Sequence, residues 1–252
     1  MSSLRWLPLL LALAVLTTWE MTVRAGLLPA VFFPPPSLVL ATLWRLIRTG
    51  EVLRQAGFTT LRLLAGFGLG SAAGIGLGMA LGWSPRLRLV IDPFVAALHP
   101  VPKVSLLPIV MIVLGVGVLS KLLVVAIAAF FPLVVNSMAG VRQIDPDYFA
   151  VARVYGAGPR RIFRQIVIPG SLPTVLAGAR IAMATSLSLT IAVELITAEN
   201  GLGAMIYFAW QTLRTEELFA AVLVIAALGF GFRALVSAAS TALTPWHEPS
   251  TA

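Results

Sequence analysis

The sequence contains no cysteine and only two histidines, His99 and His247. The absence of cysteine excludes structural disulfides and metal sites built on thiolates. The two histidines lie far apart in the sequence, and no acidic cluster surrounds His99, which we interpret as a cytoplasmic interface residue. We therefore predict that the chain has no metal centre.

Charged residues are also scarce, at 11% of the chain, whereas 59% of the residues are hydrophobic and the mean hydropathy is +0.96. Soluble globular domains carry about 25% charged residues, so this composition indicates a membrane protein. Nearly continuous apolar runs, such as residues 122–135 and 220–232, suit helices that cross a bilayer. A transmembrane β-barrel is disfavoured because its strands alternate apolar and polar residues.

Six apolar segments are candidate membrane spans. The first follows Arg5 and has the outline of a signal peptide. Because it continues through Trp19 without a small-residue cleavage site, we expect it to remain as the first span. The predicted fold class is all-α, with one polytopic transmembrane domain over residues 1–252. The expected spans are residues 6–23, 58–82, 104–118, 120–140, 172–197 and 218–242.

The basic residues indicate the orientation, since Lys and Arg favour the cytoplasmic side of a membrane. They gather in segments 83–103 and 141–171, and with six spans this places both termini in the cytoplasm. Segment 24–57 is also basic but would lie outside. Its apolar residues from Leu40 to Ile47 have helical spacing, which favours a helix along the membrane interface. The net charge of +8 therefore indicates orientation rather than a nucleic-acid partner.

Glycines recur at intervals of four along the second expected span, at Gly66, Gly70, Gly74 and Gly78. Two further glycines, Gly68 and Gly76, lie between them. Such a stripe lets another helix approach closely. We interpret it as packing within one subunit, and a dimer or gating contact is the alternative.

The loop at residues 141–171 is predicted to form two short helices. Asp145 is a good N-cap with Pro146 at the first helical position, and Gly156 ends this helix. Pro159 opens a second helix, which we expect to end before Pro169.

The first of these helices carries apolar residues that a simple connection does not need: Tyr148, Phe149, Val151, Ala152 and Tyr155. An exposed apolar surface indicates a protein partner. The alternative is that this helix packs under the chain's own bundle.

The same loop resembles a motif of permease subunits of binding-protein-dependent ABC importers. That motif is Glu-Ala-Ala, three residues, Gly, nine residues, and Ile-x-Leu-Pro. Here Ala150 to Ala152, Gly156 and Ile166 to Pro169 stand at those spacings, with Ala150 in place of the Glu and Ile168 in place of the Leu.

Further segments resemble the nitrate, sulfonate and taurine branch of these importers. They are Trp19-Glu20 followed by Gly26, Pro35-Pro36-Ser37-x-Val39, the run from Pro100 to Pro108, Gly115-x-Gly117-x-x-Ser120-Lys121, Ala192-Val-Glu194 and Gly201-Leu-Gly203. The resemblance covers about residues 15 to 210.

The resemblance implies a type I importer fold in a bacterial inner membrane. It implies that the cytoplasmic loop is a coupling helix that docks on an ABC ATPase, that two copies of the chain form the pathway, and that an external binding protein delivers the solute. The implied ATPase-coupling residues are Phe149, Ala150, Val151, Ala152, Gly156, Ala157, Ile166 and Pro169. The implied function is import of a small, anionic solute such as nitrate, a sulfonate or taurine.

The sequence itself offers no ATP site and no catalytic residues. Its two lysines, Lys103 and Lys121, do not follow a glycine, so the chain lacks the Gly-Lys-Ser/Thr loop that holds nucleotide phosphates. We therefore expect no cofactor in this chain and ATP bound by the partner subunit. A membrane-embedded enzyme is disfavoured because no nucleophile, base or carboxylate pair comes together in the sequence.

Polar residues in the expected spans are candidates for the solute pathway: Asn136, Ser186, Thr190 and Glu194. An ionisable residue at membrane depth, such as Glu194, is expected to face the bundle or water. Serine and threonine hydroxyls also bond to their own helix backbone, which is the alternative for the others.

Two other functions stay open at this point. One is a permease of the same family for a vitamin or pyrimidine precursor. The other is a self-powered secondary transporter, disfavoured because neither inverted repeats nor broken helices stand out in the sequence.

Overall fold

The computed structural model describes residues 6–246. Throughout these residues the regular elements are helices. The described chain divides into two compact units, one formed by residues 6–59 and 194–227 and the other by residues 60–193 and 228–246. Three long helices, α3 (Glu51–Trp83), α9 (Ile168–Thr197) and α11 (Thr215–Leu243), each contribute to both units.

Among residues 6–246, five helices are long and apolar enough to cross a membrane. Four are α1 (Leu7–Arg24), α3, α6 (Val118–Arg142) and α11, and the fifth is the continuous helix Pro159–Thr197, which contains α9. A sixth candidate is a pair of helices bent by 87°, formed by Pro85–Leu98 and Lys103–Leu114. The all-α class with about six spans is therefore confirmed.

The expected third span, residues 104–118, differs from the structure. It holds the short helix α5 (Leu106–Leu114), preceded by the 3-10 turn η2 (Lys103–Ser105) and ended by Gly115 at φ +80°. The expected cytoplasmic segment 83–103 is mostly the helix α4 (Pro85–Leu98). Prolines at positions 100 and 102 lie in the break between α4 and η2, where each lacks the backbone N–H that a continuing helix would need.

The second unit is built on the close contact between α3 and α6. An ideal Cβ placed on Gly66 would lie 2.6 Å from Cγ1 of Val125, and one on Gly78 would lie 2.5 Å from the carbonyl oxygen of Val134. Nothing lies within 4 Å of a Cβ placed on Gly68 or Gly76. The glycines at intervals of four therefore pack α3 against α6 within one subunit.

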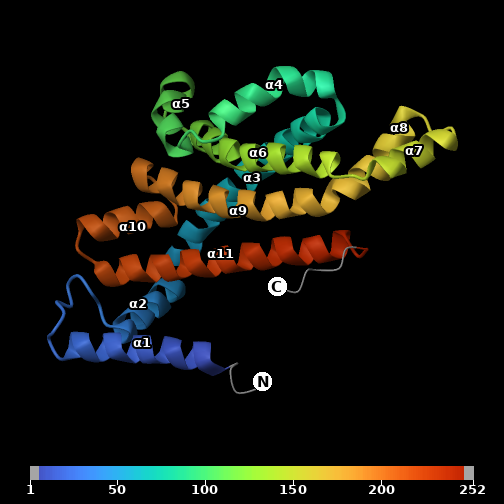
Figure 1. The fold of residues 1–252 in the computed structure, drawn as a ribbon. Coiled ribbons are helices and arrows are strands. Elements are labelled where there is room, and N and C mark those ends of the chain that lie inside the picture. Colours follow the sequence, from blue (N-terminus) through green and yellow to red (C-terminus); the bar gives the residue numbers. More distant parts are fainter. Residues whose placement is uncertain (1–5, 247–252) are drawn as a thin grey trace. The chain divides into compact units, whose positions relative to one another are not determined.

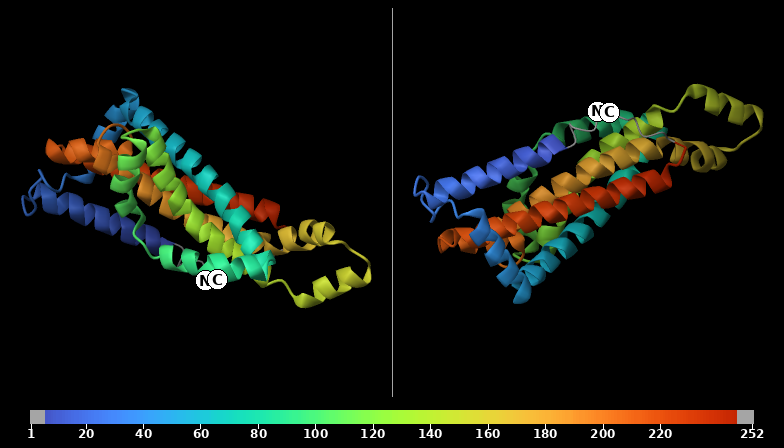
Figure 2. Two further views of the ribbon diagram at one scale, coloured as in Figure 1. Left: turned by 90° about the horizontal axis from the view of Figure 1, so that it is seen from above. Right: turned by 90° about the horizontal axis from the view of Figure 1, so that it is seen from below.

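Helix α6 also packs along α9, as all views of the ribbon show (Figures 1 and 2). Gly178 of α9 faces the side chain of Asn136, and Gly140 of α6 faces the backbone of Ser171. Buried apolar residues of α5, α6 and α9 form a core cluster: Leu107, Val124, Ala128, Leu189 and Val193. At the end of α6 and α9, the helices α7 (Pro146–Val154) and α8 (Pro159–Ile162) project away from them (Figure 2).

The first unit contains α1, α2 (Pro36–Arg48), α10 (Leu202–Gln211) and the adjoining turns of α3, α9 and α11. Trp19 of α1 contacts Phe219 of α11, with ring centroids 5.4 Å apart. Arg45 of α2 pairs with Glu217 at 3.0 Å. The predicted helix within segment 24–57 is present as α2, which buries Val39, Thr42 and Leu46.

Candidate functional site

Helix α7 begins and ends where the sequence indicates. Oδ1 of Asp145 accepts a hydrogen bond from the Asp147 N–H at 2.9 Å, and Pro146 occupies the first turn. At the other end Gly156 has φ +71°, a left-handed conformation that costs glycine little. The Gly156 N–H donates to the Arg153 carbonyl, and the Ala157 N–H donates to the Ala152 carbonyl. This is a Schellman motif, so Gly156 and Ala157 set the turn that closes α7.

One face of α7 is apolar and exposed. Tyr148 and Val151 are 64% and 56% exposed, and Val154 and Tyr155 are 85% and 84% exposed. Large apolar side chains are rarely this exposed together unless a partner or a membrane covers them. Val154 belongs to this face although its sequence position gave no signal of a role.

Phe149 does not belong to the exposed face. It is half-buried, and its ring lies 6.4 Å from the ring of Trp83, which also contacts Phe163 at 5.7 Å. This aromatic cluster fixes α7 to the end of α3 and to the segment after α8. The expectation that Phe149 is exposed for a partner is therefore wrong, because this residue anchors the loop to its own bundle.

A groove runs beside the exposed face of α7. It has a volume of about 540 Å³ and is lined by Asp145, Asp147, Tyr148, Val151, Ala152 and Ile166. Three of the implied coupling residues, Val151, Ala152 and Ile166, thus come together in one surface. Ala150 is exposed on α7, and Pro169 lines a neighbouring cavity with Ile166.

The helix that starts at Pro159 does not end before Pro169, contrary to the prediction. It continues through the π-helical segment η3 (Phe163–Val167) into α9, so that Pro159–Thr197 is one helix of 39 residues. The Ile168 N–H donates to the Phe163 carbonyl, five residues back. This wider turn reconciles the missing N–H and bulky ring of Pro169 with an unbroken helix.

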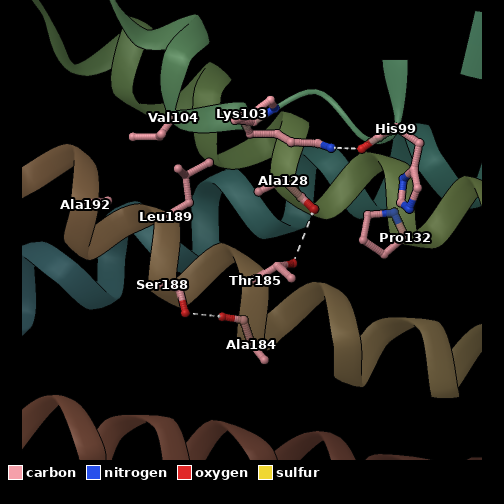
Figure 3. Close-up of a pocket in the computed structure, with 11 residues that line it drawn as sticks. His99, Lys103, Val104, Ala128, Pro132, Ala184, Thr185, Ser188, Leu189 and Ala192 are labelled. Carbon is pink, nitrogen blue, oxygen red and sulfur yellow. Dashed lines mark hydrogen bonds between the residues drawn. The ribbon is translucent and has the colours of Figure 1, made fainter. Parts of the chain in front are cut away.

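A cavity of about 600 Å³ lies between η2, α6 and α9 (Figure 3). Most of its lining is apolar, and the polar side chains are those of His99, Lys103, Thr185 and Ser188. The complete lining is His99, Pro102, Lys103, Val104, Ala128, Pro132, Ala184, Thr185, Ser188, Leu189 and Ala192.

Lys103 lies at the upper edge of this cavity in Figure 3. Its ammonium group donates a hydrogen bond to the His99 carbonyl and lies 5.0 Å from the centroid of the Phe131 ring. On the opposite wall, the Ser188 hydroxyl donates to the Ala184 carbonyl at 3.1 Å. Thr185 lies 3.4 Å from the Ala128 carbonyl across the α6–α9 contact.

None of the four pathway candidates belongs to this lining, and three of them lie in the same unit as the cavity. Asn136 donates to the Pro132 carbonyl at 2.8 Å and packs against Gly178. Thr190 is fully buried and donates to the Ser186 carbonyl at 2.8 Å, while the Ser186 hydroxyl is buried without a hydrogen-bond partner in the described part of the chain. The structure places these three residues in helix packing.

Glu194 lies in the other unit, where it is fully buried. Its Oε2 accepts hydrogen bonds from the Thr59 hydroxyl at 2.8 Å and from the Gly203 N–H at 3.1 Å. The Leu202 N–H donates to the same threonine oxygen at 2.9 Å. A carboxylate at the start of α10 satisfies N–H groups that have no partner within that helix. Glu194 therefore secures the start of α10.

Sequence reasoning did not select the polar residues of the cavity. His99 and Lys103 stand in a proline-rich segment that the charge pattern assigned to the cytoplasm. Thr185 and Ser188 look like any hydroxyl in an apolar helix. One signal was available, since Lys103 is one of only two lysines in the chain.

A comparison with protein families matches residues 70–247 to the binding-protein-dependent transport system inner membrane component. The taurine transport system permease protein TauC of Escherichia coli is 31% identical, and the match covers 92% of this chain and 86% of that protein. The putative aliphatic sulfonates transport permease protein SsuC of Bacillus subtilis is 30% identical, and the match covers 88% of this chain and 80% of that protein.

A solved structure with a similar fold is the MetNI methionine ABC transporter in inward-facing conformations. The TM-score is 0.67 at 16% sequence identity, and the match covers 77% of this chain and 96% of the compared chain. At this identity the likeness concerns the fold alone, and it agrees with the type I importer fold that the loop motif implied.

Proposed function

This chain belongs to the family of inner membrane components of binding-protein-dependent transport systems, and we propose that, as the permease subunit of an ATP-driven importer, it conducts a small anionic solute. The observation that carries the proposal is the exposed apolar face of α7 beside the groove of Val151, Ala152 and Ile166. This surface stands where the family's coupling motif stands in the sequence.

The partners follow from the family at a coarse level, since importers of this class work with an ATPase and a solute-binding protein. In the proposal, α7 inserts into a groove on the cytoplasmic ATPase, which binds and hydrolyses the ATP. Two copies of the chain form one pathway, and both termini lie in the cytoplasm with α7.

The unbroken helix Pro159–Thr197 supports a mechanical link between ATPase and pathway. Ile166 in the coupling groove and Ser188 in the cavity belong to this one helix. Closure of the ATPase subunits would move the docked α7 and α8, and α9 would carry that movement to the cavity wall. Such rigid-body coupling is the usual way in which transporters alternate access.

For the solute, the names of the relatives favour taurine or an aliphatic sulfonate. Nitrate and a vitamin or pyrimidine precursor are the alternatives. A self-powered transporter is disfavoured, because the buried carboxylate of α9, Glu194, is engaged by Thr59 and the start of α10 rather than placed for ion coupling.

The test is reconstitution of the chain with its candidate ATPase and binding protein in proteoliposomes. Uptake of radiolabelled sulfonates, taurine, nitrate and vitamin precursors is measured with and without ATP, alongside ATP hydrolysis. An ATPase that lacks its catalytic glutamate serves as the control. Solute uptake by this chain alone, without any associated ATPase, would contradict the proposal.

A further inference from the structure

We propose that the cavity between η2, α6 and α9 contacts the transported anion and that Lys103 supplies its positive charge. This inference rests on the proposed function and adds a site and a recognising residue to it. Lys103 lies outside the implied coupling surface and outside the four pathway candidates drawn from the sequence.

The depth of Lys103 in the membrane is the first argument. Its ammonium group lies over the ring of Phe131, which stands thirteen residues after Val118, the first residue of α6. At 1.5 Å per residue this is about 20 Å along a helix of about 38 Å. A cation near the middle of a bilayer is costly and is retained where it faces a water-filled cavity or a ligand.

The free bonding capacity of Lys103 is the second argument. An ammonium group has three N–H donors, and one is bonded to the His99 carbonyl. The contact with Phe131 holds the charge by a cation–π interaction and leaves further donors available. Lys103 is half-buried and lines the cavity, so a ligand there can reach it.

The composition of the lining is the third argument. The eleven lining residues include a lysine, a histidine, a threonine and a serine, and no aspartate or glutamate occurs among them. Most of the remaining wall is aliphatic. A cavity with apolar walls and a few convergent polar groups suits a small amphipathic ligand. The match is an anionic head on a short apolar body, as in an alkanesulfonate.

The same composition distinguishes an alkanesulfonate from a zwitterion. The ammonium group of taurine would lie among aliphatic side chains and near Lys103, without a carboxylate in the lining to pair with it. An unpaired charge in such a site is costly. The cavity therefore favours a sulfonate that lacks a second charge.

The absence of cysteine makes a direct test possible. Ser188→Cys places one thiol on the cavity wall of the full chain in nanodiscs. The probes are methanethiosulfonates that carry either a sulfonate or a trimethylammonium group. We expect the rate ratio of the sulfonate reagent to the cationic reagent to be higher at this thiol than with free cysteine in solution. Lys103→Gln should lower this ratio at least about threefold at low salt. The ratio cancels any change in thiol reactivity itself.

Two matched variants separate charge from folding. Lys103→Arg retains the charge and should preserve the ratio, and Arg86→Gln removes an exposed charge of α4 outside the lining and should leave the ratio unchanged. An equal ratio in the Lys103→Gln variant and its parent would overturn the proposal. Should Lys103→Gln not fold, the Ser188→Cys chain decides alone, because a sulfonate-to-trimethylammonium rate ratio no higher than that of free cysteine in solution would equally overturn it.

A second measurement uses the reconstituted importer. We expect Lys103→Gln to reduce ATP-driven uptake of butanesulfonate at least about tenfold and Lys103→Arg to restore most of it. If the wild-type importer takes up butanesulfonate and Lys103→Gln takes it up equally well, the cavity assignment is overturned while the proposed function stands. Absence of ATP-driven uptake in the wild type would instead contradict the proposed function, while the thiol ratio would still report the charge of the cavity.

Discussion

Adding one methyl group to the glycine stripe tests the packing of α3 on α6. An ideal Cβ on Gly78 would lie 2.5 Å from the Val134 carbonyl oxygen and 2.7 Å from Cβ of Ser137. Ordinary contacts between such atoms are about 3.5–4.0 Å. In Gly78→Ala the two helices must therefore separate by about 1 Å within a tightly packed contact.

The expected magnitude is a difference of two terms. Overpacking of this kind costs about 1–3 kcal/mol, and replacing glycine by alanine in a helix gains up to about 1 kcal/mol. Gly78→Ala should therefore lose about 1–2 kcal/mol of stability. Gly76→Ala is the matched control on the same helix, because nothing lies within 4 Å of its added methyl group. It should be neutral or slightly stabilising.

The assay is the thermal unfolding midpoint of the purified chain in detergent, without ATPase or binding protein. Shifts of about 2–4 °C per kcal/mol are typical for domains of this size, so Gly78→Ala should lower the midpoint by about 2–8 °C. The reasoning fails if the two variants shift the midpoint equally, or if Gly76→Ala is the more damaging. Greater damage from Gly76→Ala would mean that the face of α3 that carries Gly76 makes the closer helix contact.

Three further predictions concern α7 and α10. Val151→Asp should leave the isolated chain folded, since the side chain is exposed, yet abolish co-purification of the ATPase; retained association would exclude the α7 groove as the docking surface. Phe149→Ala should lower the unfolding midpoint of the isolated chain by removing an aromatic contact with Trp83 worth about 0.5–1.5 kcal/mol, and an unchanged midpoint would show that the contact is not formed. Glu194→Gln weakens the hydrogen bond from the Gly203 N–H by about 1–3 kcal/mol, so amide hydrogen exchange at the start of α10 should quicken, and unaltered exchange would argue against its anchoring role.

The long helices were predictable because the length of an apolar run is a local property of the sequence. A run such as residues 122–135 lacks the alternation of a barrel strand, so it satisfies its backbone in lipid as a helix. The same local reasoning gave the N-cap at Asp145 and the stop at Gly156, because capping depends on a few neighbouring residues.

The broken region around α4, η2 and α5 was not predictable in the same way. Its prolines indicate an interruption, but the direction of the chain after an interruption depends on what the next helix packs against. Here Leu107 is buried in a cluster with α6 and α9, and Lys103 is drawn over Phe131. A charge-based topology rule treats Lys103 as a loop residue because the rule counts charges and does not see such contacts.

The roles of polar residues were the hardest to assign. Glu194 looks like a pathway residue because it is a carboxylate in an apolar helix, and the contact that explains it comes from Gly203, which follows it after a turn. Conversely, the sequence around Ser188 and Thr185 does not indicate that these residues line a cavity. Only the tertiary packing decides which face of α9 meets a neighbour and which meets a cavity.

The sequence-based prediction that a helix ends before Pro169 is wrong at the π-helical segment η3, and this difference matters for function. A helix that ended before Pro169 would leave a flexible joint between the coupling loop and the membrane. The structure has instead an unbroken helix, in which twenty-two residues separate Ile166 from Ser188, or about 33 Å at 1.5 Å per residue. In the proposed mechanism, the groove beside α7 and the wall of the cavity would therefore move together, because a continuous helix joins them.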